Sequence, residues 1–334
     1  MAGGGRGYKQ AGVDLASADD ALARVSELVA STYTVGVLKG LGAFGGLFEL
    51  PAGVRSPVLV ASTDGVGTKT MLAVKRGRLA GIGRDLVNHC VNDILVQWAR
   101  PLFFLDYVAS ARLDPAGTAE VVAGVAEACR ANGAALLGGE MAEMPGVYVD
   151  GELDVVGTVV GLVEKSAIVD GSKVQGGDVV LALGSGGLQT NGFSLARSVL
   201  GGALDEPFED GAVGDALLAP HRSFLPAVGP LLERGLVRGM AHITGGGLPG
   251  NLPRSLPAGL GVRLERGSWP RPKIFDLIGQ RGAIDEDEMA RVFNLGVGFV
   301  VMVAPSAVED ARALCPEALH AIGRVVEGEG VRWA

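Results

Sequence analysis

Residues 63–69 read Thr-Asp-Gly-Val-Gly-Thr-Lys and combine the groups that bind a magnesium-phosphate complex. The Asp64 carboxylate suits a hard cation, Gly65 and Gly67 leave the backbone open to an anion, and Thr68 and Lys69 add a hydroxyl and a positive charge. A Walker A loop requires glycine directly before the lysine, and Thr68 stands there, so this is no P-loop. The segment is either a Mg²⁺-phosphate loop or a solvated turn at a strand end.

Two further acids strengthen the first interpretation. Mg²⁺ bound to a nucleotide takes one or two carboxylates besides phosphate oxygens and water. Asp93 and Glu140 each adjoin an apolar segment that could hold them, as Asp64 does. Taken singly, Asp93 is a helix-surface acid and Glu140 a loop acid. Taken together, Asp64, Asp93 and Glu140 are candidate metal ligands, with three unrelated surface acids as the equal alternative, and Asp64, Lys69 and Asp93 are the candidate catalytic residues.

The glycine-rich segment 40–45 matches the dinucleotide fingerprint G-x-G-x-x-G through Gly40, Gly42 and Gly45. That fingerprint requires a strand before it and a helix after it. Here a helix and polar residues precede it, and residues 47–51 predict a short strand, so the dinucleotide interpretation is rejected. Gly42 and Gly45 remain candidates for phosphate binding through backbone N–H groups, with a structural turn as the alternative.

A second candidate anion site precedes the helix that begins at Phe193. Thr190, Asn191 and Gly192 form a turn there, where exposed N–H groups and the helix dipole favour an anion. The alternative is an ordinary helix start. His242 precedes Thr-Gly-Gly-Gly and is interpreted as structural.

The other histidines, His89, His221 and His320, have no partner at metal-ligand spacing and receive no role. No G-x-S-x-G or H-E-x-x-H motif is present, so serine hydrolase and zinc protease chemistry have no support.

Strands that alternate with helices must position these residues, which predicts an α/β or α+β fold. On the wheel of the helix at 84–99, Asp85, Asn88, His89 and Asn92 oppose the apolar half and Asp93 lies at its edge. Helices are predicted at 19–30, with Ser17 or Asp19 as the cap, and at 84–99. Further helices are predicted from Asp114-Pro115 to Asn132-Gly133, from Phe193 onward, and after a capping box formed by Ser306 and Glu309. Strands are predicted at 57–62, 102–109, 134–137 (before a loop at 138–140), 154–163, 178–183, 297–303 and 322–326.

Length and composition set the wider frame. With 334 residues the chain predicts two domains, 13–165 and 166–334, after a flexible arm at 1–12. A net charge of −8 argues against binding to nucleic acid. The three cysteines form neither a disulfide framework nor a zinc site, and no signal peptide or membrane span is found, so a cytoplasmic protein without a membrane partner is expected.

Taken in order, these segments resemble the aminoimidazole ribonucleotide (AIR) synthetase family, also named phosphoribosylformylglycinamidine cyclo-ligase. The resemblance covers almost the whole chain, and so many motifs in one order are specific. The segments that carry it are 8–14, 40–45, 63–69, 91–93, 101–107, 138–140 with 142–146, 242–247 and 293–298.

The resemblance implies an ATP-dependent enzyme that converts formylglycinamidine ribonucleotide to AIR, with release of ADP and phosphate, in purine biosynthesis. It implies a two-domain fold whose N-terminal strands join a β-barrel across a homodimer, followed by an α/β domain. ATP and Mg²⁺ are then expected near Asp64, Lys69, Asp93 and Glu140, and the substrate phosphate near Thr190–Gly192.

Two positions depart from the family. Members commonly carry His where this chain has Gln189, and Gly where it has Trp98. Gln189 cannot shuttle a proton at neutral pH, which puts any acid-base role of that position in doubt.

Three alternatives share some of these features. Thiamine monophosphate kinase is the nearest rival, and a non-catalytic nucleotide-binding module would explain the same glycines and acids. Selenophosphate synthetase is disfavoured, because the chain has no cysteine before Cys90.

Overall fold

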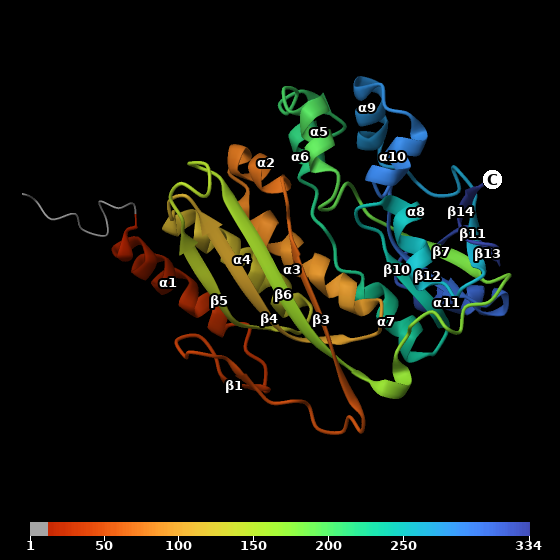
Figure 1. The fold of residues 1–334 in the computed structure, drawn as a ribbon, viewed down its shortest axis with the longest axis horizontal. Coiled ribbons are helices and arrows are strands. Elements are labelled where there is room, and N and C mark those ends of the chain that lie inside the picture. The colour runs from red at the N-terminus through yellow and green to blue at the C-terminus, as the bar shows by residue number, and fades with distance from the viewer. Residues whose placement is uncertain (1–12) are drawn as a thin grey trace, which may run out of the picture. The chain divides into compact units, whose positions relative to one another are not determined.

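The computed structural model describes residues 13–334, so the expected flexible arm at 1–12 lies outside the described residues. The chain forms two compact units: the N-terminal unit contains 13–54, 61–90 and 101–161, and the C-terminal unit contains 55–60, 91–100 and 162–334. The domain limit expected at residues 165 and 166 remains a prediction. The mixed α/β class is confirmed (Figure 1).

A four-stranded sheet with the order β3-β6-β4-β5 is the frame of the N-terminal half. Its strands are β3 (Pro57–Gly65), β4 (Arg100–Ser110), β5 (Ala135–Glu143) and β6 (Leu153–Glu164), and each overlaps a predicted strand. Among the described residues this sheet stays open, with β3 and β5 at its edges.

The prediction of a loop at 138–140 is wrong, because β5 continues through these residues in parallel register with β4. Gly139 pairs with Asp106 there, and a Cβ at residue 139 would collide with the Asp106 carboxylate. Glycine thus marks a close approach of side chain to strand rather than a break in the strand. Glu140 consequently lies on an edge strand.

The helices of this half are α1 (Leu15–Ala30), α2 (Lys69–Arg76), α3 (Leu79–Leu95) and α4 (Pro115–Ala131). Helix α1 is capped by Asp14 instead of Ser17 or Asp19, since the Asp14 carboxylate accepts the Ala16 N–H at 3.2 Å. Helix α4 begins at Asp114 and ends at Asn132, as predicted.

Helix α3 starts earlier than the predicted 84–99 and ends at Leu95. Trp98 has φ +66°, a left-handed conformation that cannot continue an α-helix, which explains the early end. Glycine adopts this conformation without steric cost, which accounts for the Gly expected at this position.

Strands β1 (Val37–Lys39) and β2 (Leu47–Phe48) pair antiparallel on either side of segment 40–45. A strand therefore precedes the glycines, where a helix and polar residues were expected. A second strand rather than a helix follows them, so rejection of the dinucleotide fingerprint is confirmed.

The C-terminal unit is built on a six-stranded sheet with the order β10-β12-β7-β13-β11-β14. Neighbouring strands run antiparallel except β11 and β14, which are parallel. The strands are β7 (Val179–Gly184), β10 (Val237–His242), β11 (Leu260–Leu264), β12 (Val297–Val303), β13 (His320–Glu327) and β14 (Gly330–Trp333), with a small pair β8 (Pro207–Phe208) and β9 (Gly211–Ala212). The predicted strands at 178–183, 297–303 and 322–326 are confirmed.

Seven α-helices and three 3₁₀ turns accompany this sheet in the described part of the chain. They are α5 (Phe193–Leu200), α6 (Val213–Leu217), α7 (Leu225–Glu233), α8 (Gly247–Asn251), α9 (Lys273–Gly282), α10 (Glu286–Val292), α11 (Val308–Leu314), and the turns Lys165–Ala167, Leu252–Ser255 and Pro305–Ala307. The Ser306 capping box is wrong: Ser306 lies within the last 3₁₀ turn, and α11 is preceded by Ala307, which makes no side-chain cap.

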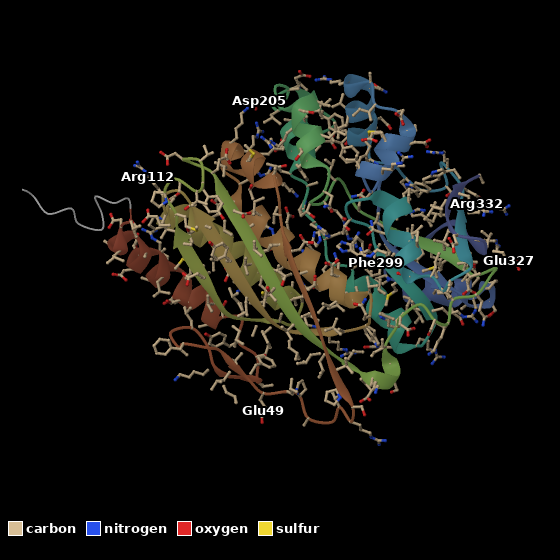
Figure 2. The ribbon with its side chains drawn as sticks, in the orientation of Figure 1. Glu49, Arg112, Asp205, Phe299, Glu327 and Arg332 are labelled. Atoms are coloured by element: carbon tan, nitrogen blue, oxygen red, sulfur yellow. The ribbon has the colours of Figure 1, made fainter. Side chains whose placement is uncertain are left out.

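Two apolar clusters hold the six-stranded sheet, and β12 is buried along its whole length. Phe299 of β12 stacks on Phe224 with ring centroids 5.4 Å apart, and Figure 2 shows Phe299 in the interior while Glu327 and Arg332 point outward. Among residues 13–334, none of the helices combines the length and apolar character needed to span a bilayer.

Candidate active site

The last residue of β10, His242, forms the centre of a buried polar cluster in the C-terminal unit. Its Nδ1 lies 2.8 Å from Oδ1 of Asp93, which the last turn of α3 supplies. The His242 side chain is 3% exposed and that of Asp93 is 30% exposed. One oxygen of Asp93 is therefore engaged by the imidazole while the carboxylate still reaches solvent.

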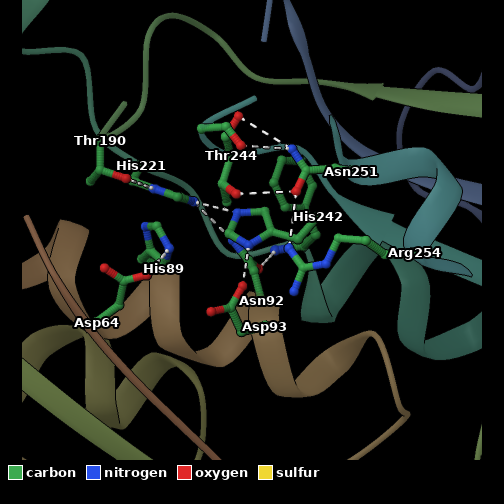
Figure 3. Close-up of polar contacts among 12 residues, drawn as sticks. Asp64, His89, Asn92, Asp93, Thr190, His221, His242, Thr244, Asn251 and Arg254 are labelled. Atoms are coloured by element: carbon green, nitrogen blue, oxygen red, sulfur yellow. Dashed lines mark hydrogen bonds and ion pairs between the residues drawn. The ribbon is translucent and has the colours of Figure 1, made fainter. Parts of the chain in front are cut away.

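A second histidine extends the cluster toward the predicted phosphate turn. His221 lies between α6 and α7 and is completely buried. Its Nε2 is 3.1 Å from Nε2 of His242, and its Nδ1 is 3.1 Å from Oγ1 of Thr190 (Figure 3). We call Asp93, His242, His221 and Thr190 the histidine relay, because they form one continuous hydrogen-bonded chain.

Asn92 fixes His221 from the side of α3. Its Oδ1 accepts the Phe224 N–H at 2.9 Å, and its Nδ2 donates to the Arg222 carbonyl at 2.8 Å. These two bonds orient the amide, so that Nδ2 also faces Nε2 of His221 at 3.2 Å. Asn92 was placed on the polar face of its helix, and here that position is fully buried.

The turn at Thr190–Gly192 opens α5, as expected. Gly192 is its N-cap with φ +80°, and a Cβ at that position would collide with the Phe293 ring, so only glycine fits. Thr190 is buried, whereas Asn191 and Gly192 are half-buried. The first N–H groups of α5 are directed to this turn, which is favourable for an anion.

The loop at 244–247 borders the same turn, since a Cβ on Gly245 would lie 3.5 Å from Nδ2 of Asn191. Asn251 shapes this loop by donating from Nδ2 to the carbonyls of Gly245 at 3.2 Å and Gly247 at 2.8 Å. Figure 3 shows Asn251 and Thr244 beside His242. The loop and the turn thus form one side of the site around the relay.

In the N-terminal unit, Asp64 lies at the end of β3 with a half-exposed side chain. Its Oδ1 accepts the Gly65 N–H at 2.7 Å, and its Oδ2 lies 2.9 Å from Nε2 of His89 on α3. The His89 side chain is only 3% exposed, whereas that of Asp64 is 44% exposed. A carboxylate that is oriented by neighbouring donors and still partly exposed suits a hydrated cation.

Lys69 begins α2 and points inward. Its Nζ lies 2.6 Å from Oδ2 of Asp85, and both side chains are 1% exposed. Burial lowers the pKa of the Lys69 amine, and the neighbouring Asp85 carboxylate opposes that shift. Contact between this amine and a phosphate would require the ion pair to open.

The remaining predicted residues lie at the surface or in turns. Glu140 is exposed, and its carboxylate accepts the Met141 N–H at 2.9 Å. Gly42 and Gly45 are exposed in the β1–β2 connection, and Gly67 has φ +64° beside the half-buried Thr68.

Asp64 and Glu140 occupy the two edge strands of their sheet, and these strands are three strand spacings, about 14 Å, apart. Within one chain, the sheet does not bring these two acids together.

Sequence reasoning missed four buried polar residues: His221, Asn92, His89 and Asp85. A signal did exist in α3, where Asp85, His89 and Asn92 recur at helical spacing opposite a face that is already apolar. A helix that is buried on both faces has to pair such groups. His221 carried no local signal, because its partners come from distant segments.

Models of the AIR synthase related protein family match this chain twice: the N-terminal domain at residues 52–163 and the C-terminal domain at 175–333. A phosphoribosylformylglycinamidine cyclo-ligase of Sorangium cellulosum is 48% identical over 330 residues, which are 96% of this chain and 95% of that protein. The chain belongs to the AIR synthase family. The predicted resemblance is therefore confirmed.

Solved structures of proteins with much lower sequence identity share the fold of this chain. Thiamine-monophosphate kinase from Stenotrophomonas maltophilia matches with a TM-score of 0.62 and 19% identity, covering 94% of this chain and 95% of its own. The hydrogenase maturation protein HypE in complex with ATP matches with a TM-score of 0.68 and 20% identity, covering 91% and 86%. At these identities the likeness concerns the fold alone.

Proposed function

We propose that this chain catalyses the ATP-dependent cyclisation of formylglycinamidine ribonucleotide to AIR, with release of ADP and phosphate. The observation that carries this proposal is the 48% identity to a phosphoribosylformylglycinamidine cyclo-ligase along nearly the whole of both chains. The kinase alternative rests on a fold match at 19% identity, which says nothing of the substrate.

The chemistry fits the kind of site that is present. ATP converts the formamide oxygen into a phosphate ester, a better leaving group, and the amidine nitrogen then closes the ring. Such a reaction depends on positioning and on stabilised charge more than on a protein nucleophile. We assign the substrate phosphate to Thr190, Asn191 and Gly192. The N-terminus of α5 favours an anion there, and Gly192 adopts a backbone conformation that leaves no room for a side chain.

For MgATP we propose Asp64, Asp93 and Glu140 as metal-contacting carboxylates, because each of these side chains is at least partly exposed to solvent. Bound Mg²⁺ would neutralise phosphate charge. Gly42, Gly45, Gly65, Gly67 and Thr68 are the proposed nucleotide-binding backbone and hydroxyl positions. Lys69 supports them by anchoring the start of α2 through Asp85, while any direct catalytic role needs that pair to open.

We further propose a homodimer in which the open sheet is completed by a second copy. The support is a set of exposed apolar side chains on the four-stranded sheet and on the β1–β2 hairpin: Leu38, Phe44, Leu47, Leu59 and Leu105. Because Asp64 and Glu140 lie on opposite sheet edges, a metal bound by both would take them from two subunits. If light scattering gives the mass of a single chain at micromolar concentration, the proposed homodimer is contradicted.

A cytoplasmic location is part of the proposal. Cys90, Cys129 and Cys315 are buried and form no disulfide, a pattern usual in a reducing compartment.

Phosphate release from MgATP tests the proposed function directly. We expect release with formylglycinamidine ribonucleotide and none with thiamine monophosphate. Release with thiamine monophosphate instead would establish the kinase, and ATP binding without turnover of either substrate would establish the binding module.

A further inference from the structure

A cavity of about 320 Å³ lies in the C-terminal unit and shares no residue with the histidine relay or with the turn at Thr190. Three separate segments line it: Trp98 after α3, residues between 167 and 173 before β7, and residues between 232 and 238 from the end of α7 into β10. Lys173 is exposed, whereas Leu232 and Val237 are buried, so the cavity leads from solvent toward the core. Its volume is at the lower end of the range for small-molecule sites.

The apolar side of this cavity is held in place by the core. Leu232 belongs to one of the two apolar clusters of the sheet, and Val169 and Trp98 pack against that cluster. The Val169 N–H donates to the Gln97 carbonyl at 3.4 Å, and the Arg100 guanidinium lies 5.2 Å from the centroid of the Trp98 ring. A wall that is fixed before binding reduces the entropy lost when a ligand binds.

Trp98 combines backbone strain with an open hydrogen-bond donor. Its φ of +66° is strained for a residue other than glycine, and strained residues cluster at ligand-binding positions. Within residues 13–334, its indole N–H meets no hydrogen-bond acceptor. An aromatic surface with an open N–H suits a flat ring that carries acceptor atoms at its edge.

Arg238 supplies an oriented guanidinium to the cavity. Its Nη1 donates to Oδ1 of Asp178 at 2.8 Å and to Oε1 of Gln175 at 3.2 Å, which leaves Nε and Nη2 as a pair of donors. The Asp178 side chain is 2% exposed and that of Arg238 is 31% exposed, so a buried acid orients a guanidinium that still reaches solvent. Such a pair of donors binds a phosphate through two hydrogen bonds.

Lys173 adds a second cation, and in the described part of the chain its ammonium forms no ion pair. Asp170 is the acid among the lining residues, and its carboxylate accepts the N–H of Ser172 at 2.9 Å. The lining side chains therefore carry more positive than negative charge, beside an apolar wall.

We propose that this cavity binds a nucleoside monophosphate, with the base against Trp98 and Val169 and the phosphate on Lys173 and Arg238. A phosphate offers three acceptor oxygens, which can serve the Arg238 donors and the Lys173 ammonium at the same time. The base supplies the flat ring that the apolar wall and the indole N–H suit. This site is separate from the proposed cyclisation and does not depend on it.

Fluorine NMR of protein labelled with 5-fluorotryptophan tests the site directly. The chain has three tryptophans, Trp98, Trp269 and Trp333, and replacing each with Phe assigns its resonance. AMP should shift the Trp98 resonance with a Kd below about 1 mM and leave the other two in place. Adenosine and inorganic phosphate should each bind at least about tenfold more weakly than AMP, because each lacks one part of the contacts.

Two variants test the phosphate contacts. Lys173→Ala should weaken AMP binding by about tenfold, whereas Lys165→Ala, which changes an exposed lysine outside the cavity, should leave it unchanged. Arg238→Lys keeps a cation beside Asp178 but loses the pair of donors, so it should fold and also bind AMP about tenfold more weakly.

A Trp98 resonance that stays in place at about 10 mM AMP would overturn the proposal. Unchanged AMP affinity in both Lys173→Ala and Arg238→Lys would also overturn it, because AMP would then bind elsewhere. Equal affinity for AMP and inorganic phosphate would contradict the ligand class, since the base would not be recognised. None of these measurements uses AIR formation, so their failure would leave the proposed cyclisation intact.

Discussion

The two units each bury a polar cluster, and the clusters are organised differently. In the N-terminal unit, Lys69 and Asp85 face each other at 2.6 Å with 1% exposure on both sides. In the C-terminal unit, the histidine relay runs through two imidazoles to a hydroxyl at the predicted phosphate turn. A buried pair of opposite charges neutralises itself locally, whereas a chain of donors and acceptors connects its two ends.

This difference shows that deep burial of a polar residue does not by itself indicate chemistry. Two buried opposite charges lose their hydration, and their mutual attraction offsets that loss, so they act mainly on stability. Imidazoles and hydroxyls change between donor and acceptor at little cost, and a chain of them can pass a proton. We therefore expect substitutions in the first cluster to alter folding and substitutions in the second to alter turnover.

The largest expected effect is on the buried ion pair. Lys69→Met leaves the Asp85 carboxylate buried without its cation, which should lower the free energy of unfolding by about 3–5 kcal/mol. The double variant Lys69→Met/Asp85→Leu removes both charges and should recover most of that loss. Urea unfolding measures both values, with Lys75→Met on the exposed side of α2 as control.

If the double variant were as unstable as the single one, charge pairing would not explain the cluster. A selective loss of ATP affinity in a stable Lys69→Met protein would instead show that the amine leaves Asp85 and contacts nucleotide.

Asp64 differs from both buried clusters, because its side chain contacts the buried His89 and is itself partly exposed to solvent. Asp64→Asn keeps the shape but removes the charge proposed to contact Mg²⁺. Turnover should fall by more than about tenfold, equivalent to about 1.4 kcal/mol of barrier, and Mg²⁺ affinity for the nucleotide-bound enzyme should fall with it. Glu127→Gln, a surface acid paired with Arg84, serves as control. Near-normal kinetics would exclude Asp64 from the metal site.

The sequence predicted several of the elements that position these clusters, among them α3 and β3, but neither α2 nor β10, which carry Lys69 and His242. The strands now seen as β3, β4, β6, β7, β12 and β13 and the caps of α4 follow from local patterns of side chains, which the fold leaves intact. The errors fall where distant contacts override local signals. Gly138 and Gly139 suggested a loop, yet β5 runs on because Gly139 makes room for Asp106.

The candidate site was less predictable than the fold. Thr190, Asp93 and Asp64 were identified because acids and turn residues stand out beside apolar segments. His221 could not be found in this way, since its hydrogen bonds come from residues 92, 190 and 242, far from it in sequence. The hydrogen-bond partners of His242, which was interpreted as structural, were not predicted for the same reason.

Asp106 gives the comparison a pH test. Burial raises its pKa from 3.8 to about 7. Between pH 3.8 and about pH 7, the folded state keeps a proton on Asp106 that the unfolded state has released. The free energy of unfolding therefore falls as pH rises through this range and levels off above it. Asp106→Asn lacks this dependence. Its Tm should match wild type near pH 4 and exceed it by about 6 °C at pH 8, since the raised pKa corresponds to about 4 kcal/mol there; a constant difference across the range would contradict the assignment.

The smallest expected effect concerns Trp98, which departs from the glycine expected in the family. Its φ of +66° costs a non-glycine residue about 1 kcal/mol, and its partly buried ring, which lies under Arg100 and against the C-terminal core, offsets that cost. Trp98→Ala loses the packing and keeps the strain, whereas Trp98→Gly loses the packing and removes the strain. The Gly variant should therefore be more stable than the Ala variant by about 1 kcal/mol in urea unfolding, although glycine is usually the more destabilising of the two. The opposite order would mean that the backbone relaxes out of the left-handed region once the ring is gone, so that the indole packing itself holds the end of α3 in place.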